Sequence, residues 1–547
     1  MGNKLIKKLY TQYILPKHKL ILISVVLSAL VTTFVNIIFP YLLKVIIDLA
    51  VARNIPGLKF NVILFAILWL LDLFIMYIYA YGLERIKVDV KKRLRMDLLR
   101  KLHTISYKEA ISESSGSYLQ KIIDDVDKID PLIVETYLDL ITQALMGIGA
   151  LYFMLKMSTI LTIVSILPLP LYLGLMMLYR KKAPVLTQLR QEDYQRVISF
   201  LDETISNTYI VRNFGIINKI LRKFNSLYDI YIKSYIKLFL FNFFYGNVLN
   251  YLVSISVQLF IIVLGAVLIL HGKLTAGSVI AFMVYVNYIK APMQYILSFS
   301  TRIEPAKVSL SRIYDIINQK ETYSLDKPLS LKQPKSEYAL RVKNLTFEYD
   351  KGEPVIKNLN FEIKNGEWVC IMGESGMGKT TLLNILLKHF PVPDGKVFIF
   401  DKDVNKMDIG EILSLITLIE QEPQFFGDMS VYENLTVGRE ISWEEIEKIA
   451  NKIGIGELLQ KIPKDKKILL KNSGLSGGEK KRLSLLRGIL RDTPIIIIDE
   501  PTAFVDRENA LKILSNLKNI LRGKTVIITT HDEKILSFCE KKIYIES

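Results

Sequence analysis

The residues best suited to chemistry lie in a glycine-rich loop, GESGMGKT, at 373–380. An apolar run precedes the loop and a run typical of a helix follows it, which is the strand–loop–helix order of loops that bind phosphate. Gly373, Gly376 and Gly378 let the backbone bend so that successive N–H groups face one anion. Lys379 would place its charge at the β- and γ-phosphates. An ordinary glycine-rich turn is the alternative, but context and pattern agree, so the sequence predicts a nucleotide site.

Oxygen-bearing side chains at predicted strand ends would complete a site that hydrolyses ATP. PIIIIDE at 494–500 is apolar on both faces, as a buried strand is, and it ends in two acids. Asp499 would hold Mg²⁺ through water, Thr380 would offer its hydroxyl to the ion, and Glu500 would polarise the attacking water. His531 ends the run TVIITTH and could hydrogen-bond the γ-phosphate. A strand-end carboxylate can serve packing and a lone histidine is usually structural, so the assignment rests on their combination.

These residues require a sheet to position them. From about residue 339 short β-rich runs alternate with helical stretches, which predicts an α/β P-loop ATPase domain with a helical subdomain over 339–547. Residues 320–338 are polar and contain two prolines, so they are predicted to form a linker. Cys370 and Cys539 have the spacing of neither a metal site nor a disulfide framework, which favours a reducing cytosolic setting.

The first part of the chain has a different composition. Half of the 547 residues are hydrophobic although the net charge is +17, which fits apolar membrane spans flanked by basic loops. Crossing a bilayer takes about 20 helical residues. Runs of this kind predict an all-α transmembrane domain of six helices within 1–319, at 20–43, 60–82, 132–155, 157–179, 241–270 and 277–299.

Charge sets the predicted orientation. The second and fourth connections between spans are long and rich in Lys and Arg, whereas the others are short and carry few, so both termini and the ATPase domain are expected in the cytoplasm. The basic excess follows these membrane-proximal loops and favours lipid headgroups over nucleic acid as partner. Residues 5–14 carry apolar side chains at helical spacing and predict a helix in the membrane interface, with a solvated basic leader as the alternative. The composition would suit a bacterial inner membrane.

A second glycine-rich motif, LSGGE at 475–479, resembles the signature LSGGQ that separates ATP-binding cassette (ABC) proteins from other P-loop ATPases. With six spans followed by one such domain, essentially the whole chain resembles an ABC exporter half-transporter. The resemblance implies that two cassettes dimerise head to tail around two ATP molecules, the partner being a second copy or, alternatively, a related half-transporter. The same LSGGE is also a plausible capping box, with Ser476 at the N-cap and Glu479 three residues later.

The resemblance assigns further roles by position. Tyr349 would stack on adenine, unless it is only a strand aromatic, and Gln421 would contact Mg²⁺ and report nucleotide state, unless it is a solvated loop amide. The implied catalytic residues are Glu500, His531, Gln421 and Lys379, and the implied Mg²⁺ ligands are Thr380, Gln421 and, through water, Asp499. The implied ATP-binding residues are Tyr349, Gly373, Glu374, Ser375, Gly376, Met377, Gly378, Lys379, Thr380 and Thr381. The residues that would contact ATP bound to the partner chain are Ser476, Gly477, Gly478 and Asp506. Coupling helices are expected near 107–118 and 208–216.

The sequence departs from the family pattern in three places. Glu479 replaces the usual glutamine, KILLKNSG before LSGGE lacks an acidic, glycine-rich stretch, and AFVD replaces the common SALD after the catalytic acid. The sequence still predicts ATP hydrolysis, because Lys379, Glu500 and His531 are present. The departures weaken the expectation that the two cassettes communicate as they do in the family.

The transported substrate is the least determined feature. Asp72 lies mid-span, where an unpaired charge costs at least ~2.5–3.5 kcal/mol, so it should face a polar cavity or pair with a base such as Lys290. The candidate cavity residues are Asp72, Asn36, Asn250, Asn287 and Lys290, and helix–helix hydrogen bonds are the alternative role for them. We expect an exporter of an amphipathic peptide, lipid or drug-like molecule. A lipid or lipid-linked glycan flippase and a non-transporting channel or sensor remain alternatives.

Overall fold

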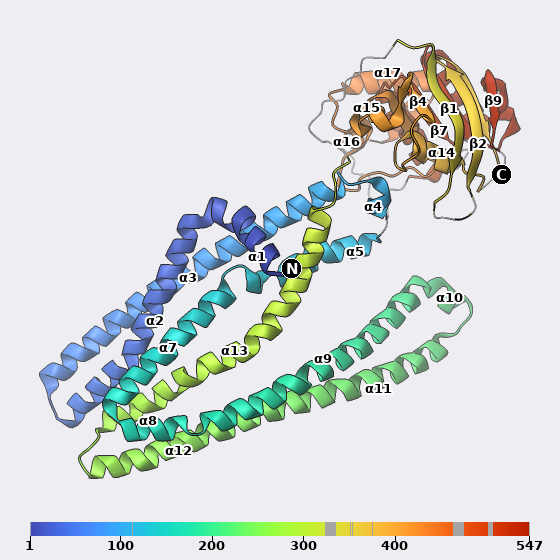
Figure 1. The fold of residues 1–547 in the computed structure, drawn as a ribbon. Coiled ribbons are helices and arrows are strands. Elements are labelled where there is room, and N and C mark those ends of the chain that lie inside the picture. The colour runs from blue at the N-terminus through green and yellow to red at the C-terminus, as the bar shows by residue number, and fades with distance from the viewer. Residues whose placement is uncertain are drawn as a thin grey trace. The chain divides into compact units, whose positions relative to one another are not determined.

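The computed structural model describes the chain except residues 1, 112, 323–334, 350–351, 353, 375, 463–474, 502–506 and 546–547. The chain forms two compact units. The first comprises residues 1–98 and 116–317 and is built of helices (Figure 1). The second comprises residues 99–115 and 318–547 and contains the two sheets of the described chain.

Long helices form the first unit and follow the predicted apolar runs. They are α2 (Leu15–Val51), α3 (Ile55–Leu102, whose last four residues belong to the second unit), α7 (Glu135–Met157), α8 (Thr159–Ile166) with α9 (Leu169–Ser206), α11 (Ile217–Asn242) with η4 (Phe243–Val248) and α12 (Leu249–Leu270), and α13 (Ala276–Ile317). Among the described residues, five continuous helical stretches are long and apolar enough to cross a membrane. The sixth predicted span lies in α13, which does not reach that apolarity because Asn287 and Lys290 interrupt it. These helices fit a multi-pass membrane protein.

The N-terminal helix is present, but its apolar side chains pack on protein. α1 (Gly2–Leu9) and η1 (Tyr10–Ile14) run directly into α2, and α1 contacts α13. Leu9 and Ile14 are fully buried, and the hydroxyl of Tyr13 donates to Asp97 Oδ2 at 2.6 Å. The structure places this part of the apolar face against its own unit. The location of the helix in the membrane interface stays a prediction.

α9 and α11 run side by side and are joined by the short helix α10 (Thr208–Asn213), which lies within the predicted coupling segment 208–216 (Figure 1). α13 packs against α2, α7 and α12. Its Phe282 and Tyr285 are fully buried there, and the Tyr285 hydroxyl donates to the carbonyl of Ile37 at 2.8 Å. The remaining short elements of this unit are α5 (Ser115–Gln120), η2 (Lys121–Asp125), α6 (Val126–Lys128) and η3 (Asp130–Leu132).

The second unit is built on a parallel five-stranded sheet and a smaller antiparallel one. The parallel sheet has the order β6 (Ile416–Ile419), β7 (Ile495–Asp499), β8 (Thr525–Thr530), β3 (Trp368–Met372), β9 (Lys541–Tyr544). The antiparallel sheet has the order β2 (Ile356–Lys364), β1 (Tyr338–Phe347), β4 (Val397–Ile399), β5 (Lys402–Asp403). The helices are α4 (Tyr107–Ile111), α14 (Lys379–Leu386), α15 (Ile409–Leu415), α16 (Val431–Thr436), α17 (Trp443–Ile453), α18 (Gly456–Lys461), α19 (Gly477–Leu490) and α20 (Arg507–Ile520), with η5 (Val404–Lys406) and η6 (Glu533–Phe538).

The run of isoleucines in β7 explains why the parallel sheet lies in the centre. Ile495 and Ile497 belong to the hydrophobic cluster on one face, and Ile496 and Ile498 to the cluster on the other. A strand that is covered on both faces must be apolar at every position. α19 covers one face closely because Gly488 has no side chain: a Cβ there would lie 2.5 Å from Ile419 Cγ1.

The two cysteines correct an expectation. They are joined by a disulfide between Cys370 in β3 and Cys539 after η6, with their Cα atoms 5.6 Å apart. This bridge could not be inferred from sequence because the partners are 169 residues apart, and the pairing of β3 with β9 brings them together. The inference from cysteine spacing, which suggested no disulfide framework and favoured a reducing setting, is therefore corrected by this bridge.

α4 packs within the second unit. Its Tyr107 ring stacks on the imidazole of His389, 4.2 Å between centroids, and meets Phe390 edge-on at 6.3 Å. The Nδ1 atom of His389 lies 3.0 Å from Asn384 Oδ1. Burial lowers the pKa of His389 below its usual value. The predicted first coupling segment, 107–118, thus begins with a short helix held by an aromatic contact.

Candidate ATP-binding and hydrolysis site

The phosphate loop has the backbone shape that its glycines predict. β3 ends at Met372 and α14 begins at Lys379, so the loop leads from a buried strand into a helix N-terminus. Gly376 and Gly378 have φ of +88° and +89°. A Cβ on Gly378 would also lie 3.0 Å from the carbonyl oxygen of Val355, so a side chain there would be both strained and crowded.

Lys379 lies over the loop. Its Nζ donates to the carbonyl of Gly373 at 2.5 Å and to that of Glu374 at 3.3 Å, and lies 3.9 Å from Glu500 Oε1. Its side chain is only 11% exposed. A lysine held in this way, beside the first N–H groups of α14, is a suitable partner for the phosphates of a nucleotide.

The remaining predicted residues gather because neighbouring parallel strands end at one edge of the sheet. Gln421 follows β6, Asp499 and Glu500 end β7, and His531 follows β8. The strand pairing is Ile419 with Ile498, Asp499 with Thr529, and Thr530 with Met372. The four strand ends therefore lie next to one another and next to the phosphate loop, as the sequence reasoning required.

Glu500 is the most constrained of these residues. It is 6% exposed and has a left-handed φ of +45°, and its N–H donates to the carbonyl of Thr529 at 3.1 Å. His531 Nδ1 lies 3.0 Å from Glu500 Oε2, while the imidazole itself is exposed. Thr529 Oγ1 donates to Asp499 Oδ1, which orients the other acid. A non-glycine residue in this conformation costs about 1–3 kcal/mol, a cost typical of residues held for function.

The donor set fits Mg²⁺ bound together with phosphate. Thr380 and Gln421 are exposed and Asp499 is nearly buried, and all three offer oxygen, the ligand that Mg²⁺ prefers. Among the described residues no group of three or more His, Cys, Asp or Glu side chains could hold a metal by itself. Mg²⁺ is usually held by one or two carboxylates plus substrate phosphates, so this sparse set agrees with that mode.

Tyr349 lies beside the loop on an aromatic cluster. Its ring is 45% exposed and meets Phe347 and Phe390 edge-on at 5.3 and 5.2 Å, and its hydroxyl lies 2.8 Å from Thr381 Oγ1. The exposed ring leaves room for a flat partner. Adenine stacking remains a prediction. Glu374 is exposed and Met377 is half-buried.

The signature segment forms the predicted capping box. Ser476 caps α19: its Oγ accepts from the N–H of Glu479 at 3.2 Å, and its own N–H donates to Glu479 Oε2 at 2.7 Å. This backbone N–H is the main reason that the pKa of Glu479 lies below its usual value. Glu479 thus uses its carboxylate within its own helix end. Ser476 and Gly477 are exposed and Gly478 is half-buried.

Three predictions fall outside the described residues. Ser375 of the phosphate loop, Asp506 with its AFVD segment, and the stretch KILLKNSG before LSGGE all belong to the parts that the structure leaves out.

Sequence reasoning missed Lys481. This residue on α19 is fully buried, and its Nζ donates to the carbonyls of Glu420 and Asp499, both at 2.7 Å, and of Gln421 at 3.4 Å. Burial lowers its pKa to about 8, although three nearby acids oppose that shift. The only hint in the sequence was its position two residues after LSGGE, because a lysine on a helix is usually solvated.

Comparison with known proteins identifies the family. The family model described as "ABC transporter transmembrane region" matches residues 21–293, and the one described as "ABC transporter" matches residues 356–503. The chain belongs to the ABC transporters. Membrane and ATPase parts therefore lie in one chain, as in a half-transporter, and the ATPase part binds nucleotide.

The chain is similar to its relatives over nearly the whole length of both partners in each comparison. "Putative multidrug export ATP-binding/permease protein YgaD" of Bacillus subtilis is 23% identical, over 99% of this chain and 95% of the relative. "Putative export ATP-binding/permease protein" of Rickettsia bellii is 26% identical, over 97% of this chain and 92% of the relative. The similarity thus extends over both parts of the ABC transporter.

The predicted substrate residues of this ABC transporter are separated. Among the described residues no hydrogen bond or ion pair joins Asp72 to Lys290, which corrects the proposed pairing. Lys290 is buried and donates to Ser254 Oγ on α12 at 2.8 Å, because α13 packs against α12. One oxygen of Asp72, Oδ1, is buried without a hydrogen-bond partner in the described part of the chain.

The amides among them are partly satisfied within their own helices. Asn36 Nδ2 donates to the carbonyl of Thr32 at 2.9 Å, and Asn287 Nδ2 to that of Met283 at 3.2 Å. Asn250 lies on α12, and the position of its side chain is outside the description. These bonds favour the alternative role within helices for Asn36 and Asn287.

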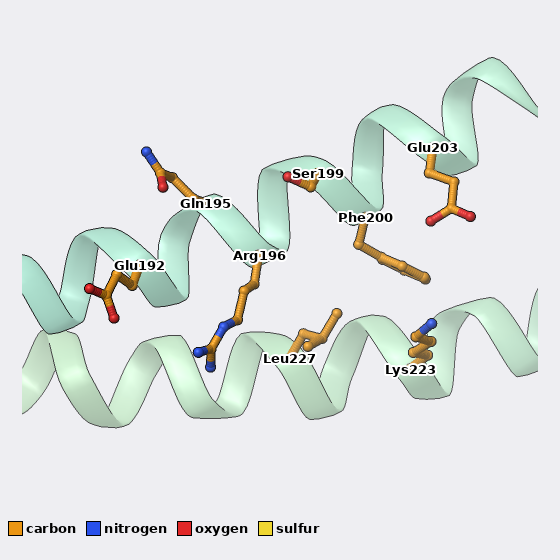
Figure 2. A pocket seen from close by; sticks show the side chains of 8 residues that line it. All are labelled: Glu192, Gln195, Arg196, Ser199, Phe200, Glu203, Lys223 and Leu227. Atoms are coloured by element: carbon orange, nitrogen blue, oxygen red, sulfur yellow. The ribbon is translucent and has the colours of Figure 1, made fainter. Parts of the chain in front are cut away.

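An open groove of about 570 Å³ lies elsewhere in this ABC transporter, between α9 and α11 (Figure 2). It is lined by Glu192, Gln195, Arg196, Ser199, Phe200, Glu203, Lys223 and Leu227. Lys223 Nζ lies 5.1 Å from the centroid of the Phe200 ring. Acids and bases are mixed along the groove, so it favours neither sign of charge, and it contains none of the predicted substrate residues.

Proposed function

We propose that this ABC transporter is an ATP-driven exporter that moves an amphipathic substrate out of the cytoplasm, as a dimer of two half-transporters. The names of both relatives contain the word "export", and the chain covers more than nine-tenths of each. The unpaired oxygen of Asp72 within a span is compatible with a partly cationic substrate. The spans, with basic connections on one side, favour a bacterial cytoplasmic membrane with the ATPase unit inside the cell.

The observation that carries the proposal is the position of Glu500. Its backbone is fixed, its carboxylate lies between Lys379 Nζ at 3.9 Å and His531 Nδ1 at 3.0 Å, and it is nearly buried. Glu500 would accept a hydrogen bond from the attacking water, and Lys379 and His531 would bind oxygens of the γ-phosphate. Thr380 and Gln421 would hold Mg²⁺ directly and Asp499 would hold it through water, and the ion would neutralise phosphate charge.

Replacing the carboxylate tests this role. Glu500→Gln keeps the shape of the side chain but removes the base, so we expect ATP turnover to fall by roughly 10² or more while ATP still binds. Turnover is measured as released phosphate, and binding with a fluorescent ATP analogue. Glu411→Gln on α15, which changes a half-exposed carboxylate in the same way, is the control. Wild-type turnover in Glu500→Gln would rule out the assignment.

Transport itself is tested by reconstituting the purified chain alone in liposomes. Mg²⁺-dependent ATPase activity, stimulated by an amphipathic cation and accompanied by uptake of that cation into inside-out vesicles, is expected of a homodimeric exporter. If activity appears only after a second, different half-transporter is added, the functional unit is a heterodimer rather than a homodimer. Movement of labelled lipid between leaflets, with no solute uptake, would favour a flippase instead.

A further inference from the structure

Lys481 is a buried cation that contacts the main chain at the ends of β6 and β7. These two strand ends carry Gln421, Asp499 and Glu500 of the proposed site. It is fully buried on α19, and no ion pair within 4.0 Å includes it among the described residues. Instead its Nζ contacts three main-chain carbonyls, those of Glu420, Gln421 and Asp499. An ammonium has three N–H donors and no acceptor, so this arrangement matches every donor to one oxygen.

The contact with Asp499 bears on Glu500. The peptide group between them is held from both sides: its carbonyl accepts from Lys481 at 2.7 Å, and its N–H donates to the carbonyl of Thr529 at 3.1 Å. Glu500 itself has a left-handed φ of +45°, which a non-glycine residue keeps only when its surroundings impose it. Removing the lysine would leave this peptide free to turn and the carboxylate free to move.

The contacts with Glu420 and Gln421 act on the neighbouring strand end. β6 stops at Ile419, and the next two carbonyls both point at the same ammonium. One side chain therefore joins the helix that starts with the signature motif to the ends of β6 and β7. A shift of the helix would be passed to both strand ends, because the links are short and buried.

We propose that Lys481 is a positioning residue for ATP hydrolysis, which fixes the main chain at Gln421 and Asp499 and thereby the carboxylate of Glu500. The inference rests on the role given to Glu500 under the proposed function. A lysine that served only to fill the core would affect stability without a selective effect on turnover.

Three variants of the full-length chain separate these roles. K481M keeps an unbranched side chain, one atom shorter, and removes all donors. K481Q keeps two N–H donors for the two short bonds, and K480M changes the neighbouring, half-exposed lysine as a matched control. ATPase rates over a range of ATP concentrations give kcat and KM, and thermal unfolding reports folding.

We expect K481M to lower kcat by roughly 10-fold or more with KM for ATP within about 2-fold, since a carboxylate displaced from the reacting water affects the transition state rather than binding. K481Q should recover most of the loss, and K480M should match wild type. Wild-type kcat in K481M would overturn the proposal. The proposal would also be overturned if K481M raised KM as much as it lowered kcat and K481Q showed the same defect.

If K481M does not fold, K481Q alone decides: with two donors in place of three, a kcat lowered by only about 2- to 3-fold with unchanged KM supports the proposal, and a kcat equal to that of the wild type overturns it. Glu500→Gln is measured in parallel. An inactive Glu500→Gln with a fully active K481M rejects only the positioning role, whereas an active Glu500→Gln rejects the proposed role of Glu500 itself.

Discussion

At the scale of single residues, main-chain contacts hold Lys379 and the backbone of Glu500 in the proposed site. Lys379 bonds to carbonyls of its own loop, and Glu500 is fixed through its N–H. Main-chain groups move little, so they can hold a charged side chain ready before substrate arrives. The site is therefore preorganised by the backbone.

Glu479, which departs from the family motif, uses its carboxylate to cap its own helix. Its carboxylate accepts from both the N–H and the hydroxyl of Ser476. We expect Glu479→Ala to destabilise the ATPase unit by about 1 kcal/mol, as loss of an N-terminal cap does, and Glu479→Gln to change little because the amide oxygen still accepts. Denaturant unfolding measures both.

The chain supplies its own control for this prediction. Ser430 and Glu433 form a second capping box, at the start of α16 rather than of α19. Glu433→Ala should lower stability by a similar amount with no effect on ATPase activity. Equal stability of Glu479→Ala and wild type would show that the box contributes nothing.

At the scale of elements, the aromatic contact of α4 makes its packing dependent on pH. Burial lowers the pKa of His389 in the folded protein, so near pH 6 the unfolded chain binds a proton that the folded site refuses. The contribution of neutral His389 to the stability of the folded protein is therefore fully present above the unfolded pKa of about 6.5 and falls as the pH drops below it.

We expect the unfolding midpoint to fall more steeply between pH 7.5 and 5.5 in the wild type than in His389→Phe. Phenylalanine keeps a ring against Tyr107 but cannot take a proton. Thermal unfolding at a series of pH values measures the two slopes. Equal slopes would contradict the assignment to His389.

Elements with local signals were predictable from sequence, and contacts between distant segments were not. The phosphate loop and the β7 strand are recognised from consecutive residues, and the spans from unbroken apolar runs. Three contacts join segments that are separated in the sequence: the disulfide, the bond from Lys481 to the carbonyl of Asp499, and the bond from Lys290 to Ser254. No periodicity encodes such pairs, so only the assembled fold reveals them.

At the scale of the whole molecule, the site of one chain is proposed to be incomplete. The residues around Lys379 would bind and hydrolyse ATP, but Ser476 and Gly478 would act on ATP held by a second chain. ATP would then favour the closed dimer through its higher affinity for that state, and hydrolysis would release it. Helices of the membrane unit would follow this cycle.

The most direct measurement is a cross-link between the two motifs in the assembled protein. Glu374→Cys and Ser476→Cys, both exposed positions, are introduced together into the Glu500→Gln chain so that bound ATP persists. With saturating Mg²⁺ and ATP, a short thiol cross-linker should yield a covalent dimer on a denaturing gel, and little without nucleotide. Absence of that dimer when ATP binding has been verified would contradict the account.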